Sequence, residues 1–224
     1  DGFGDMHDRR DKSGSGFAHC SLLALENNDD ALARLQTLKS LEYNNGKSES
    51  SAWWELLKGK RLKDLSMPAI EKLKQAAVYK EAGLVAMHTD VTNQDKDLAL
   101  YFRSSTYGSN GHMHANNNSF NLSFKGNKIF YPTGYYTSFA DKHSISSYKH
   151  TRASNSLLID GKGQSYGHEG YGWIKRYLHG EKITYTCGDA SKAYGELVND
   201  QWSDLVNQHL VDSGRTIKEN FGDV

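Results

Sequence analysis

The segment richest in groups that could do chemistry runs from Tyr107 to Phe120 and reads YGSNGHMHANNNSF. It places His112 and His114 two residues apart, so both side chains point to one side if the segment is extended. Imidazoles transfer protons or bind metal ions, and the asparagines that follow offer directional hydrogen bonds. A polar surface loop is the alternative, and it is the commoner explanation of an isolated His-x-His pair without visible further ligands.

A second cluster spans residues 135–156 and reads YYTSFADKHSISSYKHTRASNS. Its tyrosines and histidines can transfer protons, and Arg152 can hold a carboxylate through two parallel hydrogen bonds. The alternative is a tyrosine-rich loop that covers apolar edges, which we would favour without the first cluster. A third stretch, 159–173, is glycine-rich and could line a groove, although ordinary turns are the commoner explanation of such a stretch.

The elements that must position these clusters change character near residue 81. Before it, apolar spacing predicts two helices within 22–41, a short helix over 53–57, and a third starting at Pro68. That third helix would carry Ala77 and Val78 on its apolar side. After it, period-two alternation predicts strands, with a tight hairpin turn at 125–128. The expected strands lie within 83–90, 97–104, 120–124, 129–131, 156–160, 172–178 and 182–187.

Helices followed by many short strands favour an α domain joined to an antiparallel β-sandwich. The chain lacks both βαβ alternation and a phosphate-binding glycine loop, so nucleotide-dependent chemistry has no support. Its 224 residues carry 27 Lys+Arg against 27 Asp+Glu, a balance that argues against a nucleic-acid partner. No apolar run approaches the roughly 20 residues that a membrane-spanning helix needs. The two cysteines, Cys20 and Cys187, give neither a metal spacing nor a disulfide framework.

Three stretches, taken in order, resemble the heparinase II/III-like family of polysaccharide lyases. They are GHMHANNNSFNLSF from Gly111, PTGYY from Pro132 and ASNSLLIDGKGQ from Ala153. The resemblance is good over 81–195 and looser over 1–80. It implies an α+β chain in which 1–80 end a helical α/α toroid and 81–224 begin an antiparallel β-sandwich. We therefore expect a piece of a longer protein that needs the rest of its own chain, an upstream toroid and a downstream part of the sandwich.

The chemistry implied by this resemblance is β-elimination beside a uronic acid in an anionic polysaccharide. The substrate carboxylate is neutralised, a Tyr or His removes the C5 proton, and a Tyr or His protonates the leaving oxygen. On the family pattern His112 is the catalytic histidine, and Tyr148 lies near the position of a catalytic tyrosine in alginate-cleaving relatives. The expected substrate-binding residues are Asn116, Asn118, Tyr136 and Arg152. The toroid's own catalytic residues would precede Asp1.

A structural zinc is the one cofactor that the resemblance raises, with His114 at a metal-ligand position. The other two ligand positions hold Pro132 and Ser154, and the family's motif aspartate is Asn116 here. We therefore expect no cofactor and no complete zinc site.

Two functions follow from these features. The first is a lyase acting on heparan sulfate, chondroitin, hyaluronan, alginate or ulvan, in the periplasm or secreted, where such polymers occur. The second is a glycan-binding sandwich that kept the fold and lost activity, which the replaced metal ligands favour. An assembly interface formed by the aromatic strands has only composition behind it.

Overall fold

The computed structural model describes residues 74–109, 112–134 and 144–194. Its contacts divide the chain into two units, Arg9–Lys74 and Asp1–Asp8 with Gln75–Val224. All described residues except Lys74 belong to the second unit. The helices expected before residue 74 lie outside the described residues, as does the expected substrate ligand Tyr136. In the part of the chain that is described, no helix is long and apolar enough to cross a membrane.

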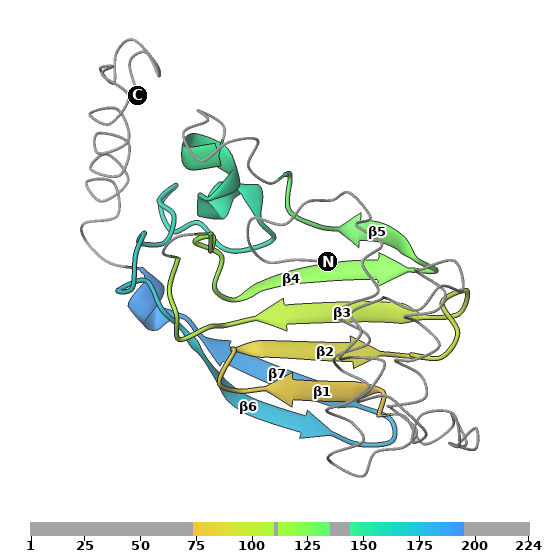
Figure 1. Cartoon of the computed structure of the whole chain (residues 1–224). Helices are drawn as coiled ribbons and strands as arrows, with labels where there is room; N and C mark the ends of the chain where they lie inside the picture. Colours follow the sequence, from red (N-terminus) through yellow and green to blue (C-terminus); the bar gives the residue numbers. More distant parts are fainter. Residues whose placement is uncertain (1–73, 110–111, 135–143, 195–224) are drawn as a thin grey trace, which may run out of the picture. The chain divides into compact units, whose positions relative to one another are not determined.

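Antiparallel strands dominate the described residues, as predicted (Figure 1). Five strands form one sheet in the order β1-β2-β3-β4-β5, and a separate hairpin forms a second sheet of β6 and β7. Single turns of other helix types, η2 (Ser144–Tyr148), η3 (Thr151–Ala153) and η4 (Ser191–Ala193), complete the described elements. The strands are β1 (Ala76–Tyr79), β2 (Leu84–His88), β3 (Leu98–Arg103), β4 (Ser119–Phe124), β5 (Asn127–Phe130), β6 (Trp173–His179) and β7 (Thr184–Asp189).

The strand register separates an apolar face of the large sheet from a polar one. Met87, Leu100 and Leu122 lie opposite one another on neighbouring strands and share the apolar face. The next positions along, Tyr101 with Asn121 and then Arg103 with Ser119, share the other face. Period-two alternation therefore brings Arg103 and Ser119 to the polar side, at the end of the sheet where the loop 104–118 begins and ends.

The β6–β7 hairpin contacts the apolar face near this same end. A Cβ on Gly188 would lie 2.8 Å from the ring of Phe102, so glycine is needed where the β7 backbone crosses this ring. Farther along, the β6–β7 turn and the apolar face leave an open cleft of about 780 Å³, lined in part by Leu100, Leu122 and Ile183.

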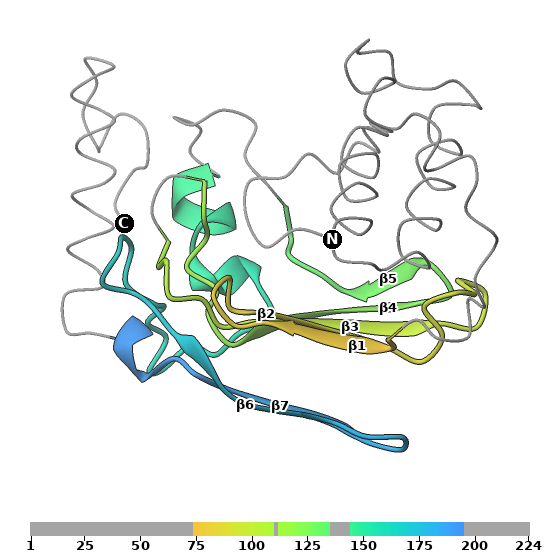
Figure 2. The ribbon, with the colours of Figure 1, turned by 60° about the horizontal axis from the view of Figure 1, so that its bottom comes forward.

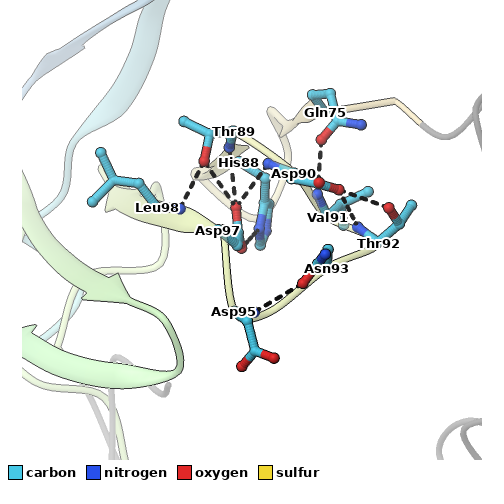
Figure 3. Close-up of polar contacts among 10 residues, drawn as sticks. All are labelled: Gln75, His88, Thr89, Asp90, Val91, Thr92, Asn93, Asp95, Asp97 and Leu98. Atoms are coloured by element: carbon cyan, nitrogen blue, oxygen red, sulfur yellow. Dashed lines mark hydrogen bonds and ion pairs between the residues drawn. The ribbon is translucent and has the colours of Figure 1, made fainter.

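The turn between β2 and β3 lies at the opposite end of the strands and is built from short-range polar contacts (Figure 3). The Asp97 carboxylate accepts hydrogen bonds from the backbone N–H groups of Thr89 and Asp90, at 3.1 and 3.0 Å, and lies 2.6 Å from Nδ1 of His88. Asp90 in turn accepts hydrogen bonds from the backbone N–H and hydroxyl of Thr92. These Asx-type contacts fix a turn without a buried core.

The prediction of a third helix is wrong for its last residues. Ala77 and Val78 lie on strand β1 and pair with Ala86 and Val85 of β2. The four-residue step from Leu73 to Ala77 fits a helix, but antiparallel pairing with a neighbouring strand outweighs a weak local preference. The large sheet therefore starts at Ala76, before the boundary expected between residues 80 and 81.

The strand predicted over 156–160 is also wrong. The segment forms only an isolated bridge between Ile159 and Lys162, around Asp160 and Gly161 with φ of 52° and 76°. Two successive left-handed residues reverse the chain at once, as in a type I′ turn. Leu157 is 70% exposed, so the apolar run that suggested a buried strand does not pack on a sheet.

Candidate active site

The polar end of the sheet is unusual because its interior is made of polar side chains. Residues from β3, the loop 104–118, the segment 144–151 and the segment 163–165 are buried there together. Buried polar groups are tolerated only when hydrogen-bonded, so this region must be organised as a network. The members are Arg103, Ser104, Ser105, Ser109, His114, Asn116, Asn117, Ser119, Lys149, His150, Thr151, Gln164 and Ser165.

Arg103 ties together both ends of the histidine-bearing loop. Its side chain is 1% exposed. Nη2 donates to the carbonyl oxygen of Gly108 at 3.0 Å, and Nη1 donates to the side-chain oxygen of Asn116 and to the carbonyl of His114 at 3.4 Å. Burial lowers the pKa of Arg103 to about 10, which still leaves the guanidinium charged at neutral pH.

Gln164 fixes the next part of the loop. Its side-chain oxygen accepts the backbone N–H of Asn117 at 2.7 Å, and its Nε2 donates to the backbone carbonyl of Asn117 at 2.8 Å. The side chain of Asn117 extends the network to two further segments. Its Oδ1 accepts a hydrogen bond from the backbone N–H of Ser105, and its Nδ2 donates one to the carbonyl of Gly170, both at 2.8 Å. The glycine-rich third stretch is thereby joined to the first cluster.

The second cluster joins the same network through Thr151. Its hydroxyl donates to the carbonyl of Ala115 at 2.7 Å and accepts the backbone N–H of Gln164 at 2.8 Å. The N–H of Ala115 donates to the carbonyl of Lys149 at 2.9 Å. Described parts of the three stretches singled out in the sequence therefore meet at one end of the fold, in the region of loops and short turns beyond β3 and β4 (Figure 2).

His150 is a neutral, structural member of this network. Its Nδ1 accepts hydrogen bonds from the backbone N–H and Nε of Arg152, at 3.2 and 3.3 Å, which leaves the proton on Nε2. Burial, aided by the charge of Arg152, lowers the pKa of His150 to about 4. A Cβ on Gly163 would lie 2.5 Å from the imidazole, so glycine is needed where the third stretch crosses this ring.

The two histidines of the first cluster have different surroundings. His112 is exposed on a turn, whereas His114 is 1% exposed. The chain turns at His112, so the extended segment in which both side chains would point to one side is not formed there. His112 is therefore the member of the pair that a large substrate could contact.

Tyr148 and Arg152 lie on the segment that packs beside this loop. Tyr148 ends η2 and is half-buried, with its ring against the backbone of Gly134, where a Cβ would lie 2.5 Å from the ring. The N–H of Thr133 donates to the carbonyl of Ala153 at 2.8 Å, which joins the PTGYY stretch to the second cluster. Arg152 is exposed, so its guanidinium lies at the surface above His150.

Asn116 and Asn118 are not equivalent candidates for binding a substrate. Asn116 is 0% exposed and accepts from Arg103, so direct contact with a polymer does not fit its position. Asn118 is half-buried in a left-handed conformation with φ of 53°, and its Nδ2 donates to the carbonyl of Gly188 at 3.2 Å. Its Oδ1 has no hydrogen-bond partner in the structure.

The three positions at which the resemblance suggests zinc ligands hold His114, Pro132 and Ser154. Among the described residues, no group of three His, Cys, Asp or Glu side chains is placed to hold a metal ion. Pro132 has no ligand atom, and the buried hydroxyl of Ser154 has no hydrogen-bond partner and is a poor zinc ligand. His114 alone offers a zinc-binding atom type at these three positions.

Sequence reasoning missed three residues that organise the site, namely Arg103, Asn117 and Gln164. Arg103 carried a signal, since an arginine closes the otherwise apolar strand 98–103 on the same face as Tyr101. Gln164 ends the stretch ASNSLLIDGKGQ, but nothing in the sequence tells which backbone its amide will bind.

A family model named heparinase II/III-like, C-terminal, matches residues 71–217. The chain belongs to this family. No curated protein sequence matches the chain significantly.

Solved structures with a similar fold include two of the heparan sulfate lyase HepC from Pedobacter heparinus. One is similar with a TM-score of 0.52 and 14% sequence identity, over 86% of this chain and 25% of that chain. The other, a mutant of the same lyase, has a TM-score of 0.51 and 14% identity, over 82% of this chain and 24% of that chain. The chain thus spans about a quarter of the length of these lyases, and at this identity the similarity concerns the fold.

Proposed function

We propose that the protein is a polysaccharide lyase that cleaves a uronic-acid-containing polymer by β-elimination. The observation that carries this proposal is the exposed His112 on a loop whose flanks are fixed by buried hydrogen bonds. A proton-transfer group works best when its position is fixed before the substrate arrives. Membership of the heparinase II/III-like family supports the same reaction.

In the proposed reaction, His112 and Tyr148 are the two proton-transfer groups. One takes the C5 proton of the uronate, the electron pair forms the C4–C5 double bond, and the other protonates the departing oxygen. Arg152 is proposed to contact the uronate, because its side chain is exposed and carries a positive charge, and Asn118 stays a predicted substrate ligand. Neutralising the carboxylate lowers the cost of removing the C5 proton. Tyr136 stays a predicted substrate ligand.

Heparan sulfate is the first polymer to test, because the similar solved structures are heparan sulfate lyases. Chondroitin, hyaluronan, alginate and ulvan contain uronic acids as well and belong in the same panel. We further propose that the protein acts in the periplasm or after secretion, where such polymers are found, and that it needs no metal cofactor. The replaced ligand positions, Pro132 and Ser154, support the last point.

A non-catalytic glycan-binding protein is the second candidate. The same replaced positions favour it, together with Asn116 in place of the family's aspartate. Such a protein would bind a polyanionic glycan and leave it intact.

The test is to incubate the full-length protein with each polymer and follow the ultraviolet absorbance of the new C4–C5 double bond. A rise on at least one polymer is expected and would name the substrate class. A flat trace on every polymer, with measurable binding to one of them, would reject the lyase and support the binding protein.

A further inference from the structure

The histidine-bearing loop rests on a buried positive charge, that of Arg103, for which the described residues offer no negative partner. Arg103 makes its hydrogen bonds to two backbone carbonyls and one side-chain amide oxygen, all of them neutral. Within the part of the chain that the structure describes, no carboxylate forms an ion pair with it. Buried charges are normally paired, because removing an ion from water is costly. An unpaired buried arginine therefore calls for an explanation.

The position of these acceptors supplies one. Gly108 precedes His112 and His114 follows it, and one guanidinium holds the carbonyl oxygens of both. The planar guanidinium has five donors in a fixed arrangement, so it fixes the separation of its acceptors in a way that a single-headed side chain cannot. Arg103 closes the base of the loop that presents His112.

The absence of a negative partner has a second consequence. A carboxylate at position 116 would cancel the charge of Arg103, whereas Asn116 bonds to the guanidinium and leaves its charge in place. A charge in a poorly solvated interior acts over a longer distance than an exposed one. The loop is therefore more attractive to a polyanion than it would be above an Arg–Asp pair.

We propose that Arg103 is a positioning residue that fixes the base of the His112 loop and, through the neutral Asn116, keeps a positive potential beneath it for an anionic polysaccharide. This inference rests on the proposed function, because it assigns His112 to substrate chemistry. It predicts that replacing Arg103 makes the loop less ordered. It also predicts that an aspartate in place of Asn116 stabilises the protein and weakens its binding to a polyanion.

The test compares Arg103→Met and Asn116→Asp in the full-length protein, with Arg176→Met, an exposed arginine on β6, as the matched control. Hydrogen exchange of residues 108–116 and the NMR signals of the His112 ring report on the loop. The dissociation constant for a heparan sulfate oligosaccharide reports on the potential. These readouts need no turnover, so a flat lyase assay would reject the proposed function without deciding this inference.

Arg103→Met is expected to speed exchange in 108–116 by about tenfold or more, since three buried acceptors lose their donor. Asn116→Asp is expected to keep the loop protected and raise the melting temperature, yet weaken oligosaccharide binding roughly three- to tenfold. Arg176→Met should change neither readout. If Arg103→Met fails to fold, Arg103→Lys takes its place, and faster exchange limited to 108–116 is again expected. Unchanged loop exchange in the folded position-103 variant, or unchanged affinity in Asn116→Asp, would overturn the inference.

Discussion

A charged side chain lies at each end of strand β3, Asp97 at its start and Arg103 at its end, and the two are held by different kinds of contact. At the start of β3, the Asp97 carboxylate is bound by backbone groups and by His88, all within nine residues in the sequence (Figure 3). At its end, Arg103 is buried, and the network around it reaches as far as Gly170 through Asn117. One end is a self-contained turn, and the other is built from three distant segments.

The difference decides which end brings distant segments of the chain together. The Asp97 carboxylate is occupied by hydrogen bonds within its own turn, and a turn of this kind can form in almost any sheet. Long-range contacts, by contrast, bring segments together around a shared interior, and they leave His112 exposed and Tyr148 half-buried on segments bonded to that interior. Convergent segments of this kind are what a catalytic constellation requires.

The largest effect is expected from Gln164→Ala at the long-range end. The variant loses the two hydrogen bonds to the Asn117 backbone and those to the hydroxyls of Ser156 and Tyr194. The buried Asn117 N–H is left unsatisfied, whereas its carbonyl still accepts from the Ser156 hydroxyl, and the free energy of unfolding should fall by about 3 kcal/mol. Urea unfolding followed by fluorescence measures this change. Lys162→Ala, at an exposed neighbouring position, is the control and should be nearly neutral. A loss below about 1 kcal/mol for Gln164→Ala would show that the network does not depend on this residue.

A smaller effect is expected from Asp97→Ala at the local end. The turn loses its shared acceptor, and the free energy of unfolding should fall by about 2 kcal/mol, since solvent can replace part of each bond. Activity on the polymer identified above should not change, because Asp97 lies at the far end of β3. Initial rates at saturating polymer test this point, and a large loss of rate would erase the contrast between the two ends.

The pH dependence of stability should depend on His150. Because its pKa is about 4 in the folded protein and near 6.5 when unfolded, the unfolded chain takes up the proton first as the pH falls. Stability from the neutral ring is present above pH 6.5 and is lost on the way down to pH 4. Between pH 7 and pH 5 this should cost about 1 kcal/mol, allowing for solvent screening.

Urea unfolding at the two pH values measures the loss, and His150→Gln should reduce it. The exposed His179 provides the control, since His179→Gln should lose stability with pH as the unsubstituted protein does. Equal pH dependence in all three proteins would mean that His150 does not titrate in the way its burial implies.

The smallest effect is expected on the β6–β7 hairpin. Lys175 lies 3.4 Å from the Asp189 carboxylate and is largely exposed, so Lys175→Ala should change the free energy of unfolding by less than about 0.5 kcal/mol. Any effect should vanish in high salt. A salt-resistant loss above about 1 kcal/mol would place this pair among the stabilising contacts of the fold.

The same contrast between local and distant contacts governs what the sequence could predict. Strands β2, β3, β4, β6 and β7 follow from period-two alternation, and the tight turn at Lys125 and Gly126 follows from a glycine between two strands. Strand β1 was predicted as helix because Ala77 and Val78 suit either structure until a partner strand is present. The stretch 156–160 looked like a strand because exposed apolar residues cannot be told from buried ones in the sequence alone.

For the site, the residue types were predictable and their relations were not. The clusters around His112 and Tyr148 stand out by composition, and the structure brings their segments together through Thr151 and Ala115. The burial of His114 and Asn116, and the part played by Arg103, depend on contacts between segments far apart along the chain. A periodicity argument contains no information on such contacts.

The most direct test of the central claim, that His112 takes part in polysaccharide cleavage, compares three forms of the full-length protein on the polymer that gives the largest absorbance rise. These are the unsubstituted protein, His112→Ala, and His179→Ala as a matched histidine control outside the site. We predict that His112→Ala lowers kcat by about a hundredfold or more, while polymer binding and His179→Ala stay near the unsubstituted values. Full activity in folded His112→Ala would contradict the account.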